Sequence, residues 1–270
     1  LQDRIAVVTG AASGIGQATA VELARRGCHL ALVTRRDREG LEETARQVQA
    51  LGRKVTLHLA DVSDRQRMQA LPQEVIAEHG HVHVLVNNAG VTILAAFEDH
   101  SIDDLDWIIG TNLWGVLHGT YFFLPYLKRE EEGHIVNVSS IQGLLALPAQ
   151  ASYSATKFAL RGFGEALRGE LSPHRIGVTT VYPGLVKTSI VASSRVRGED
   201  QESLRAWLAP YIASRTMAPE KCARRIVAGI RRNRARVRIT AASHLADWSK
   251  RLLPTATDRV VAVLQRARPF

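Results

Sequence analysis

IAVVTGAASGIG, residues 5–16, is the stretch that decides the fold. An apolar run of strand length leads into a turn that contains Gly10, Gly14 and Gly16, and a helical pattern follows over residues 14–26. In such a unit the first glycine permits the tight turn and the second lets the backbone approach a pyrophosphate. The third glycine lets the helix pack on the sheet. Free N–H groups at the helix N-terminus favour phosphate binding. Glycine-rich turns are common, so the strand before it and the helix after it carry the prediction of a dinucleotide site.

Apolar runs of strand length alternate with helical patterns along the rest of the chain. The expected strands are 5–8, 29–34, 54–59, 82–86, 134–138, 176–182 and 237–240. The expected helices are 14–26, 39–51, 64–79, one or two within 101–131, 152–171 and 219–232. This alternation predicts βαβ units with right-handed crossovers. We therefore expect an α/β fold, a single doubly wound Rossmann-type domain with a mostly parallel seven-stranded sheet and helices on both faces.

The composition is that of a globular protein. The chain has 270 residues, 46% of them apolar, which excludes a disordered or collagen-like chain. We expect one domain over residues 1–270, with a substrate lid at 188–218 and a basic C-terminal extension at 241–270. Two cysteines cannot form a disulfide framework, and no run of 18 apolar residues or signal peptide is evident. These features favour a cytoplasmic protein, although an anchor lost before Leu1 stays possible.

The charge is concentrated at the C-terminal end. The net charge of the chain is +9, and residues 195–270 hold 17 Lys and Arg against six Asp and Glu. The arginine-rich segment 231–238 could bind phosphates, but its alternation with apolar residues is also that of a charged edge strand. No aromatic residues stand among these arginines, so we expect no nucleic-acid partner. A modest amphipathic helix at 258–268 would allow at most peripheral membrane contact, and packing on the domain or on a partner subunit is favoured for it.

The end of the second expected strand bears on the choice of cofactor. NAD-binding proteins usually carry an acid here that binds the ribose 2′-hydroxyl, whereas this chain has Thr34 and then Arg35. A guanidinium at this position would pair with a 2′-phosphate. The sequence therefore favours NADP(H) over NAD(H). Asp37 could still bind a ribose hydroxyl if the loop takes a different course, and a solvated surface arginine is the alternative for Arg35.

Tyr153 and Lys157 are spaced so that they share one face of a helix. A free tyrosine has a pKa near 10, and a neighbouring cation favours the phenolate. Tyr153 could then exchange a proton with a carbonyl or alcohol oxygen while a hydride moves to or from a nicotinamide. Ser140 follows the fifth expected strand, at the edge where open parallel sheets bind ligands, and could hold the same oxygen.

Together these motifs resemble those of the short-chain dehydrogenase/reductase family over about residues 4–240. The motifs fall in the family's order and spacing: Thr9–Gly16, Asn87–Gly90, Asn112, Ser140, Tyr153, Lys157 and Pro183-Gly184. The resemblance implies that Tyr153 is the catalytic acid and base and that Lys157 also binds the nicotinamide ribose. It further implies that Ser140 is the donor to the substrate oxygen and that Asn112 holds a water in a proton relay.

The resemblance also implies a set of cofactor-binding positions. Asp61 resembles the acid at adenine, Asn88 to Gly90 the segment along the adenosine ribose, and Pro183 to Thr188 the loop that holds the carboxamide. Ser13 stands where many NADP-preferring members carry a basic residue, so that second marker is absent. The expected cofactor residues are Gly10, Ser13, Gly14, Ile15, Gly16, Thr34, Arg35, Asp61, Val62, Asn88, Ala89, Gly90, Tyr153, Lys157, Pro183, Gly184, Val186 and Thr188.

These observations predict an oxidoreductase that transfers a hydride between NADP(H) and a carbonyl compound or secondary alcohol. Apolar residues in the lid and after Ser140 favour a medium or large apolar substrate, although lid arginines such as Arg195 and Arg197 could bind a carboxylate. The alternative is a non-catalytic NAD(P)-binding or regulatory protein with a basic surface for an anionic partner. The resemblance implies a dimer or tetramer that pairs through helices near 112–131 and 152–171. The histidine-rich segment 79–83 is read as strand alternation, and no metal site is expected.

Overall fold

One parallel sheet of seven strands organises the fold. The computed structural model describes residues 1–188, 190, 193–198 and 216–266, without the side chains of 264–266. The strands are β1 (Ile5–Thr9), β2 (His29–Thr34), β3 (Val55–Leu59), β4 (Val84–Asn87), β6 (Gly133–Val138), β7 (Ile176–Tyr182) and β9 (Arg236–Arg238). Their order is β3-β2-β1-β4-β6-β7-β9, and all neighbouring pairs are parallel. The expected fold class is confirmed.

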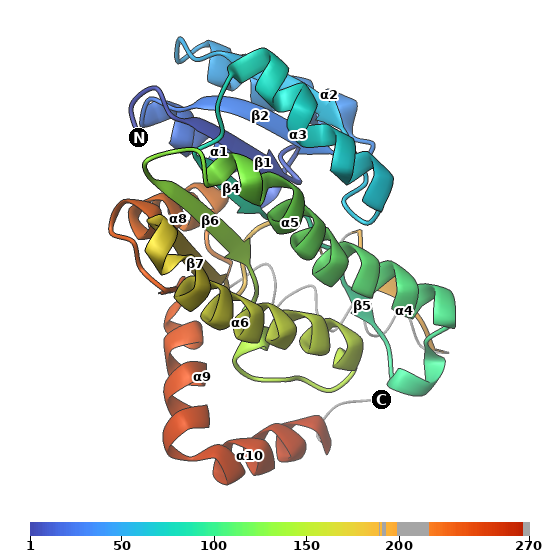
Figure 1. Cartoon of the computed structure of the whole chain (residues 1–270). Coiled ribbons are helices and arrows are strands. Elements are labelled where there is room, and N and C mark those ends of the chain that lie inside the picture. The colour runs from blue at the N-terminus through green and yellow to red at the C-terminus, as the bar shows by residue number, and fades with distance from the viewer. Residues whose placement is uncertain (189, 191–192, 199–215, 267–270) are drawn as a thin grey trace.

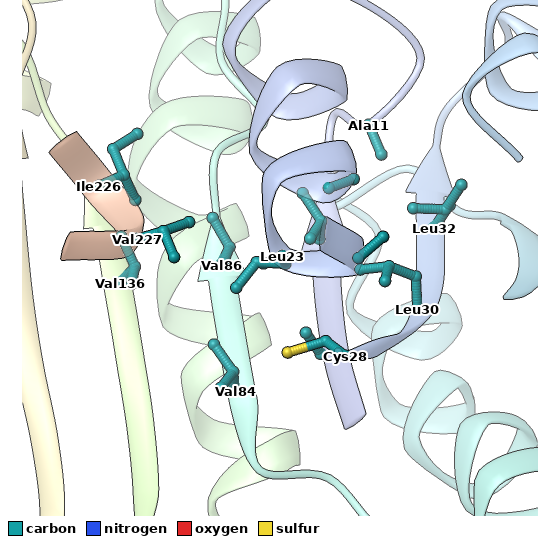
Figure 2. Close-up of a cluster of buried hydrophobic side chains, with 14 of the residues drawn as sticks. Ala11, Leu23, Cys28, Leu30, Leu32, Val84, Val86, Val136, Ile226 and Val227 are labelled. Atoms are coloured by element: carbon teal, nitrogen blue, oxygen red, sulfur yellow. The ribbon is translucent and has the colours of Figure 1, made fainter. Parts of the chain in front are cut away.

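Helices cover both faces of this sheet (Figure 1). On one face, strand residues such as Val8, Leu32 and Val86 pack against α1 (Gly14–Arg25), α2 (Arg38–Gln49) and α8 (Pro219–Arg231). Figure 2 shows this core, with Leu23 of α1 and Val227 of α8 directed at the strands. The other face packs against α3 (Arg65–His79), α5 (Gly115–Leu127) and α6 (Ala151–Leu171). Because both faces are covered, the central strands β1 and β4 consist mostly of consecutive apolar residues rather than alternating ones.

The strand order creates the crevice in which open α/β sheets bind ligands. β1 pairs with β2 on one side and with β4 on the other, so the chain leaves β1 in both directions across the sheet. Loops after β1 and β4 therefore separate at the carboxyl edge, and a ligand can enter between them.

Several boundaries differ from the sequence-based expectation. The stretch 101–131 forms two helices, α4 (Ile102–Ile109) and α5, joined by a π-helical turn over Gly110–Trp114. The fourth strand begins at Val84 rather than 82, because its ladder with β1 starts where Ala6 pairs with Val84. A short parallel pair, β5 (Ile93–Leu94) with β8 (Arg195–Val196), was not expected. Two residues in each strand are too few to give a hydropathy pattern.

The C-terminal extension forms two consecutive helices that meet at a sharp bend, here called the C-terminal hairpin (Figure 1). α9 (Ala241–Leu252) was not expected, and α10 (Pro254–Arg266) begins earlier than the expected helix at 258–268. Thr240 caps α9 by accepting a hydrogen bond from the backbone N–H of Ser243. Pro254 opens α10, the position in a helix where a missing N–H costs nothing. Within the described part of the chain, none of the helices combines the length and the apolarity that crossing a bilayer requires.

Most of the expected lid lies outside the described residues. Residues 193–198, here called the lid stem, are described, and so are Ile190 and residues 216–218. Of the apolar lid residues, Trp207 and its neighbours in 199–215 fall outside the description.

Candidate cofactor and active site

The expected site residues gather at the carboxyl edge of the sheet. The glycine turn follows β1, Thr34 ends β2, and Asp61 follows β3. Asn88 follows β4, Ser140 follows β6 and Pro183 follows β7, while Tyr153 and Lys157 lie in the first turns of α6. Because parallel strands end at one edge, residues from 10 to 188 can face one ligand.

The glycine turn has the backbone that its residues predict. Gly10 and Gly14 have φ values of +64° and +58°, in the left-handed region that favours glycine. A Cβ at Gly16 would overlap the carbonyl oxygen of Gly10. A Cβ at Gly14 would lie 2.9 Å from the Cγ2 atom of Thr188. The turn thus depends on glycine at three positions, and the expected carboxamide loop reaches it through Thr188.

Asn88 and Thr9 tie the turn to the end of β4. The Asn88 amide nitrogen donates to the Thr9 carbonyl oxygen at 2.9 Å and to that of Gly10 at 3.2 Å. The Thr9 hydroxyl accepts from the backbone N–H groups of Asn88 and Ala89, at 2.9 and 3.1 Å. These bonds fix the two loops that border the crevice.

A cavity of about 150 Å³ lies between the ends of β1, β2, β3 and β4. At its wall, Arg35 lies 3.5 Å from an Asp61 carboxylate oxygen, and both side chains are about one third exposed. Burial raises the pKa of Asp61, but hydrogen bonds from Ser63 and the charge of Arg35 outweigh it, so the net pKa is lowered. The cavity is lined by Gly10, Val33, Thr34, Arg35, Ala60, Asp61, Val62, Ala89, Gly90, Val91 and Thr111. Seven of these residues belong to the expected cofactor set.

Asp37 caps a helix in the structure. It is the N-cap of α2, and its carboxylate accepts from the Gly40 N–H at 2.9 Å. This capping bond uses Oδ1 of the carboxylate, so the ribose contact proposed for Asp37 stays a prediction.

Tyr153 and Lys157 meet at a buried point beside the end of β6. The Tyr153 ring packs among Ile93, Ala95 and Ile108, and 8% of the residue is exposed. The Lys157 ammonium lies 5.6 Å from the centroid of this ring and donates to the Val138 carbonyl oxygen at 3.1 Å. A hydrogen bond links Ser140 to the phenol of Tyr153.

The expected lowering of the Tyr153 pKa is not what the structure gives. Burial raises the pKa of Tyr153, and the hydrogen bond with Ser140 only partly opposes that rise. Burial also lowers the pKa of Lys157 to about 8. The lysine therefore loses its proton before a tyrosine with a raised pKa would titrate, so it carries no charge to stabilise the phenolate there. At neutral pH the phenol keeps its proton and the lysine is mostly protonated.

Asn112 lies in the π-helical turn that separates α4 from α5. Its side-chain oxygen accepts from the Val91 N–H at 2.8 Å, and its nitrogen donates to the Val91 carbonyl at 2.9 Å and to Thr156 at 3.2 Å. The side chain is thus committed to protein partners. A water held by Asn112 would bind the backbone carbonyl, which a π-helical turn withdraws from regular helical bonding. Asn112 and Lys157 both lie next to Gly90, because a Cβ at Gly90 would lie 3.4 Å from Asn112 Oδ1 and 3.5 Å from Lys157 Nζ.

An ion-pair cluster beneath the lid stem escaped the sequence analysis. Asp104 on α4 has a side chain only 1% exposed, and it accepts from Arg195 at 2.8 Å and from Arg197 at 2.8 and 2.9 Å. The Arg195 guanidinium also lies 3.9 Å from the centroid of the Trp107 ring. Two charged hydrogen-bond donors and the Ser101 cap lower the pKa of Asp104 far below its usual range, against the effect of burial.

This cluster answers one question that the sequence left open. Arg195 and Arg197 were candidates for binding a substrate carboxylate, but both pair with a carboxylate of the chain itself. The capping pattern Ser101-x-x-Asp104 was visible in the sequence and could have marked the helix start. The pairing itself spans about 90 residues and leaves no local pattern.

The three clustered histidines separate in the structure. His79 Nε2 lies 2.9 Å from the Thr56 hydroxyl, whereas His81 and His83 lie 3.0 and 3.2 Å from Glu130. The nitrogen and oxygen atoms of His81, His83 and Glu130 all lie within 4.8 Å of one another, close enough for a metal ion to be considered.

The hydrogen bonding of His83 argues against a metal ion there. His83 Nδ1 accepts from the backbone N–H of Ile5 at 3.1 Å, so the proton of the neutral ring belongs on Nε2. That Nε2 atom faces Glu130 and donates to it. A metal ion would need the lone pair of Nε2, which the proton occupies, and the expectation of no metal site therefore stays our prediction.

The arginines of the edge strand are held by acids of the chain. Arg236 lies 2.7 Å from Glu165 on α6, and Arg238 lies 2.8 Å from the buried Asp247 on α9. Val237 between them is buried. This alternation matches the interpretation of a charged edge strand.

Fold and site together define a Rossmann-type nucleotide-binding protein with a Ser, Tyr and Lys group beside its crevice. The short chain dehydrogenase family matches residues 4–198, and the chain belongs to this family. It is 39% identical over 264 residues to the "Putative oxidoreductase SadH" of Mycobacterium tuberculosis, covering 97% of this chain and 95% of that protein. It is 40% identical over 186 residues to the Arabidopsis thaliana 11-beta-hydroxysteroid dehydrogenase-like 4A, covering 68% and 61%.

The fold has a close counterpart among solved structures. A short chain dehydrogenase/reductase from Burkholderia phymatum, solved in complex with NAD, superposes with a TM-score of 0.86 at 30% identity, covering 93% of each chain. The protein is therefore an oxidoreductase of the short-chain dehydrogenase type, and a nicotinamide cofactor is supported.

Proposed function

We propose that this protein is an NADP(H)-dependent oxidoreductase that interconverts an apolar carbonyl compound and its secondary alcohol. The observation that carries the proposal is the group formed by the buried Tyr153 and Lys157 and the half-buried Ser140 at the carboxyl edge of the sheet. The left-handed backbone of Gly10 and Gly14, at the start of α1, and the cavity between the ends of β1, β2, β3 and β4 fit a dinucleotide, whose pyrophosphate such a turn can approach closely. When bound, the cofactor supplies or accepts the hydride.

The chain's own residues manage the proton and the substrate oxygen. Tyr153, with its raised pKa, keeps a proton at neutral pH and can donate it to a carbonyl oxygen as charge develops there. Ser140 donates to the same oxygen and holds it in place. Lys157 is anchored to Val138, and its ammonium would bind the nicotinamide ribose.

Arg35 supports the preference for NADP(H). Its guanidinium stands at the wall of the cavity with partial exposure, and its nearest acid, Asp61, lies 3.5 Å away, a loose ion pair. A 2′-phosphate carries more charge than this single carboxylate and would bind the guanidinium with charge-assisted hydrogen bonds. The Burkholderia relative was solved with NAD, so the preference needs its own test.

The apolar surroundings of Tyr153 support an apolar substrate. Ile93, Ala95 and Ile108 pack around the tyrosine, and the two arginines of the lid stem, Arg195 and Arg197, both pair with Asp104. A substrate carboxylate would have to compete with that buried carboxylate. The steroid dehydrogenase-like name of the Arabidopsis relative agrees with a large apolar substrate.

A screen of ketones, aldehydes and secondary alcohols, with NADPH and NADH side by side, tests the proposal. We expect turnover of apolar ketones with NADPH, and an Arg35→Ala variant should raise KM for NADPH about tenfold or more while changing KM for NADH little. Arg38→Ala is the matched control, because Arg38 is an exposed arginine three residues further on, at the start of α2, where it pairs with Glu42. Equal efficiency with both nucleotides would refute the cofactor preference, and turnover of only small charged keto acids would refute the substrate class.

The second candidate is a non-catalytic NAD(P)-binding protein with a basic surface. The net charge of +9 favours it, whereas the assembled Tyr153, Lys157 and Ser140 group favours an enzyme. Nucleotide binding without turnover across the whole screen would support this second candidate.

We also propose self-association through α5 and α6, as the family resemblance implies. Tyr121 on α5 and Trp114 beside it are 73% and 53% exposed, which is unusual for aromatic side chains on a monomer's surface. Light scattering should give a dimer or tetramer, and Tyr121→Asp should lower the mass.

The two free thiols, Cys28 and Cys222, are buried and have raised pKa values of about 11 and 12, which suits the cytoplasm we propose.

A further inference from the structure

The C-terminal hairpin presents apolar side chains on the side that faces away from the sheet. Leu245, Trp248 and Leu252 of α9 follow one another at spacings of three and four residues, so they form one stripe on the helix. They are 69%, 56% and 68% exposed. The opposite side of α9 is buried through Ala246 and Asp247. The stripe is therefore not the face that attaches the helix to the fold.

The apolar surface continues across the elbow between the two helices. Leu253 at the elbow is 63% exposed, and Val260 and Val263 on α10 are 57% and 63% exposed. Figure 1 places this elbow at the far end of α9 from the sheet. The elbow borders a hollow of about 560 Å³ that is open to solvent and is lined by Leu252, Leu253, Pro254, Thr255, Ala256 and Arg259. The two helices and their elbow thus expose six apolar side chains, and exposed apolar surface of this kind marks an interaction site.

Cations surround this elbow. Lys250 and Arg251 precede it, and Arg259 follows it and lines the hollow. Lys250 pairs with Asp258 at 2.6 Å, and Arg251 pairs with the buried Asp247 at 2.8 Å, while Arg259 has no acidic partner within the described part of the chain. Residues 250–259 thus hold three cations and one acid, within a chain of net charge +9.

A second copy of the chain or a lipid bilayer could cover such an apolar surface. The charge of the elbow distinguishes between these two occupants. A second copy that met this patch about a twofold axis would bring Lys250, Arg251 and Arg259 against the same three cations of its partner. An anionic bilayer offers an apolar interior to the leucines and phosphates to the cations.

We propose that the elbow of the α9–α10 hairpin is a docking surface for an anionic lipid bilayer. Leu252 and Leu253 enter the boundary of the acyl chains, and Arg259 contacts headgroup phosphates. The protein lies on the membrane without crossing it.

Docking at the elbow would fix the orientation of the active site relative to the bilayer. Ala246 of α9 packs with Leu144 and Tyr182, so α9 is fixed to the loop that follows Ser140. The substrate side of the site would therefore keep a constant position relative to the bilayer. This would suit an apolar substrate dissolved in lipid, although the docking itself does not depend on the proposed reaction.

Sedimentation of the full chain with lipid vesicles tests the docking surface. The probes are vesicles of phosphatidylcholine alone and vesicles in which one third is replaced by phosphatidylglycerol. We expect binding to the anionic vesicles at least about tenfold tighter than to the neutral ones, weakened by salt. Leu252→Ser combined with Leu253→Ser should weaken it about tenfold, and Arg259→Gln about fivefold.

Leu59→Ser is the matched control, because Leu59 is a partly exposed leucine on β3, at the opposite edge of the sheet from β9. It should bind vesicles as the unaltered chain does. The proposal is overturned if the chain binds neither kind of vesicle, or if the double variant binds as well as the control. It is also overturned if the double variant lowers the mass in light scattering and leaves vesicle affinity unchanged, since a second copy would then cover the patch. Vesicle binding is read without turnover, so failure of the proposed reaction would leave this result standing.

Discussion

The cofactor side and the substrate side of the crevice are held together by different means. On the cofactor side, Gly10, Gly14 and Gly16 fit against backbone atoms and short side chains, and Asn88 closes the turn with hydrogen bonds to main-chain oxygens. On the substrate side, the lid stem is held by one buried carboxylate, Asp104, and two arginines that come from far along the chain. The first arrangement tolerates no added atom, whereas the second depends on charges that can be removed singly.

Tyr153→Phe should have the largest effect, because it removes the group at which the two sides meet. We expect kcat to fall about 10³-fold, since proton transfer by a positioned side chain contributes between 10² and 10⁴. Phenylalanine keeps the packing on Ile93 and Ile108, so the melting temperature and nucleotide affinity should change little. Steady-state kinetics and nucleotide titration measure this, and a variant that kept a tenth of the activity would remove Tyr153 from the proposed role.

Gly16→Ala should break the cofactor side alone. The added Cβ would overlap the Gly10 carbonyl oxygen, and the backbone must move to relieve the overlap, at about 3 kcal/mol of unfolding free energy. Nucleotide affinity should fall with it. Gly162→Ala is the control, because a Cβ there meets nothing within 4 Å and an alanine in helix α6 should stabilise by about 0.5 kcal/mol or more. Denaturant unfolding of both variants decides, and equal stability of the two would contradict the close fit.

The same contrast explains which parts of the structure could be predicted from the sequence. The glycine turn, the doubly wound parallel sheet and the gathering of Ser140, Tyr153 and Lys157 follow from local patterns, since parallel strands end at one edge. The pairing of Asp104 with Arg195 could not be predicted, because it joins two segments about 90 residues apart and either residue alone is an ordinary surface charge. The prediction that the pKa of Tyr153 is lowered was wrong for a related reason. The sequence shows that a lysine is near but not how deeply both groups are buried.

Asp104→Asn should loosen the substrate side and leave the cofactor side intact. Both arginines lose their charged partner, and because they are more than one third exposed we expect a loss of about 2 kcal/mol, less than for a fully buried pair. KM for an apolar substrate should rise severalfold, while kcat and nucleotide affinity stay within about twofold. Asp103→Asn, at an exposed neighbour on α4, should change none of these values. A rise in nucleotide Kd as large as the rise in KM would show that the two sides are not independent.

The stability difference between the unaltered chain and Asp104→Asn should also depend on pH in a defined direction. Hydrogen bonds from Arg197 and Arg195 hold the pKa of Asp104 well below its unfolded value of about 3.9. The stabilisation is therefore fully present above that value and is lost as the pH falls toward the folded pKa. From pH 8 to pH 5 the difference should stay constant, and between pH 4.5 and pH 3.5 it should shrink by about 0.6 kcal/mol. Denaturant unfolding at each pH measures it. A difference that began to shrink near pH 6 would mean that a histidine, not the Asp104 carboxylate, controls the lid stem.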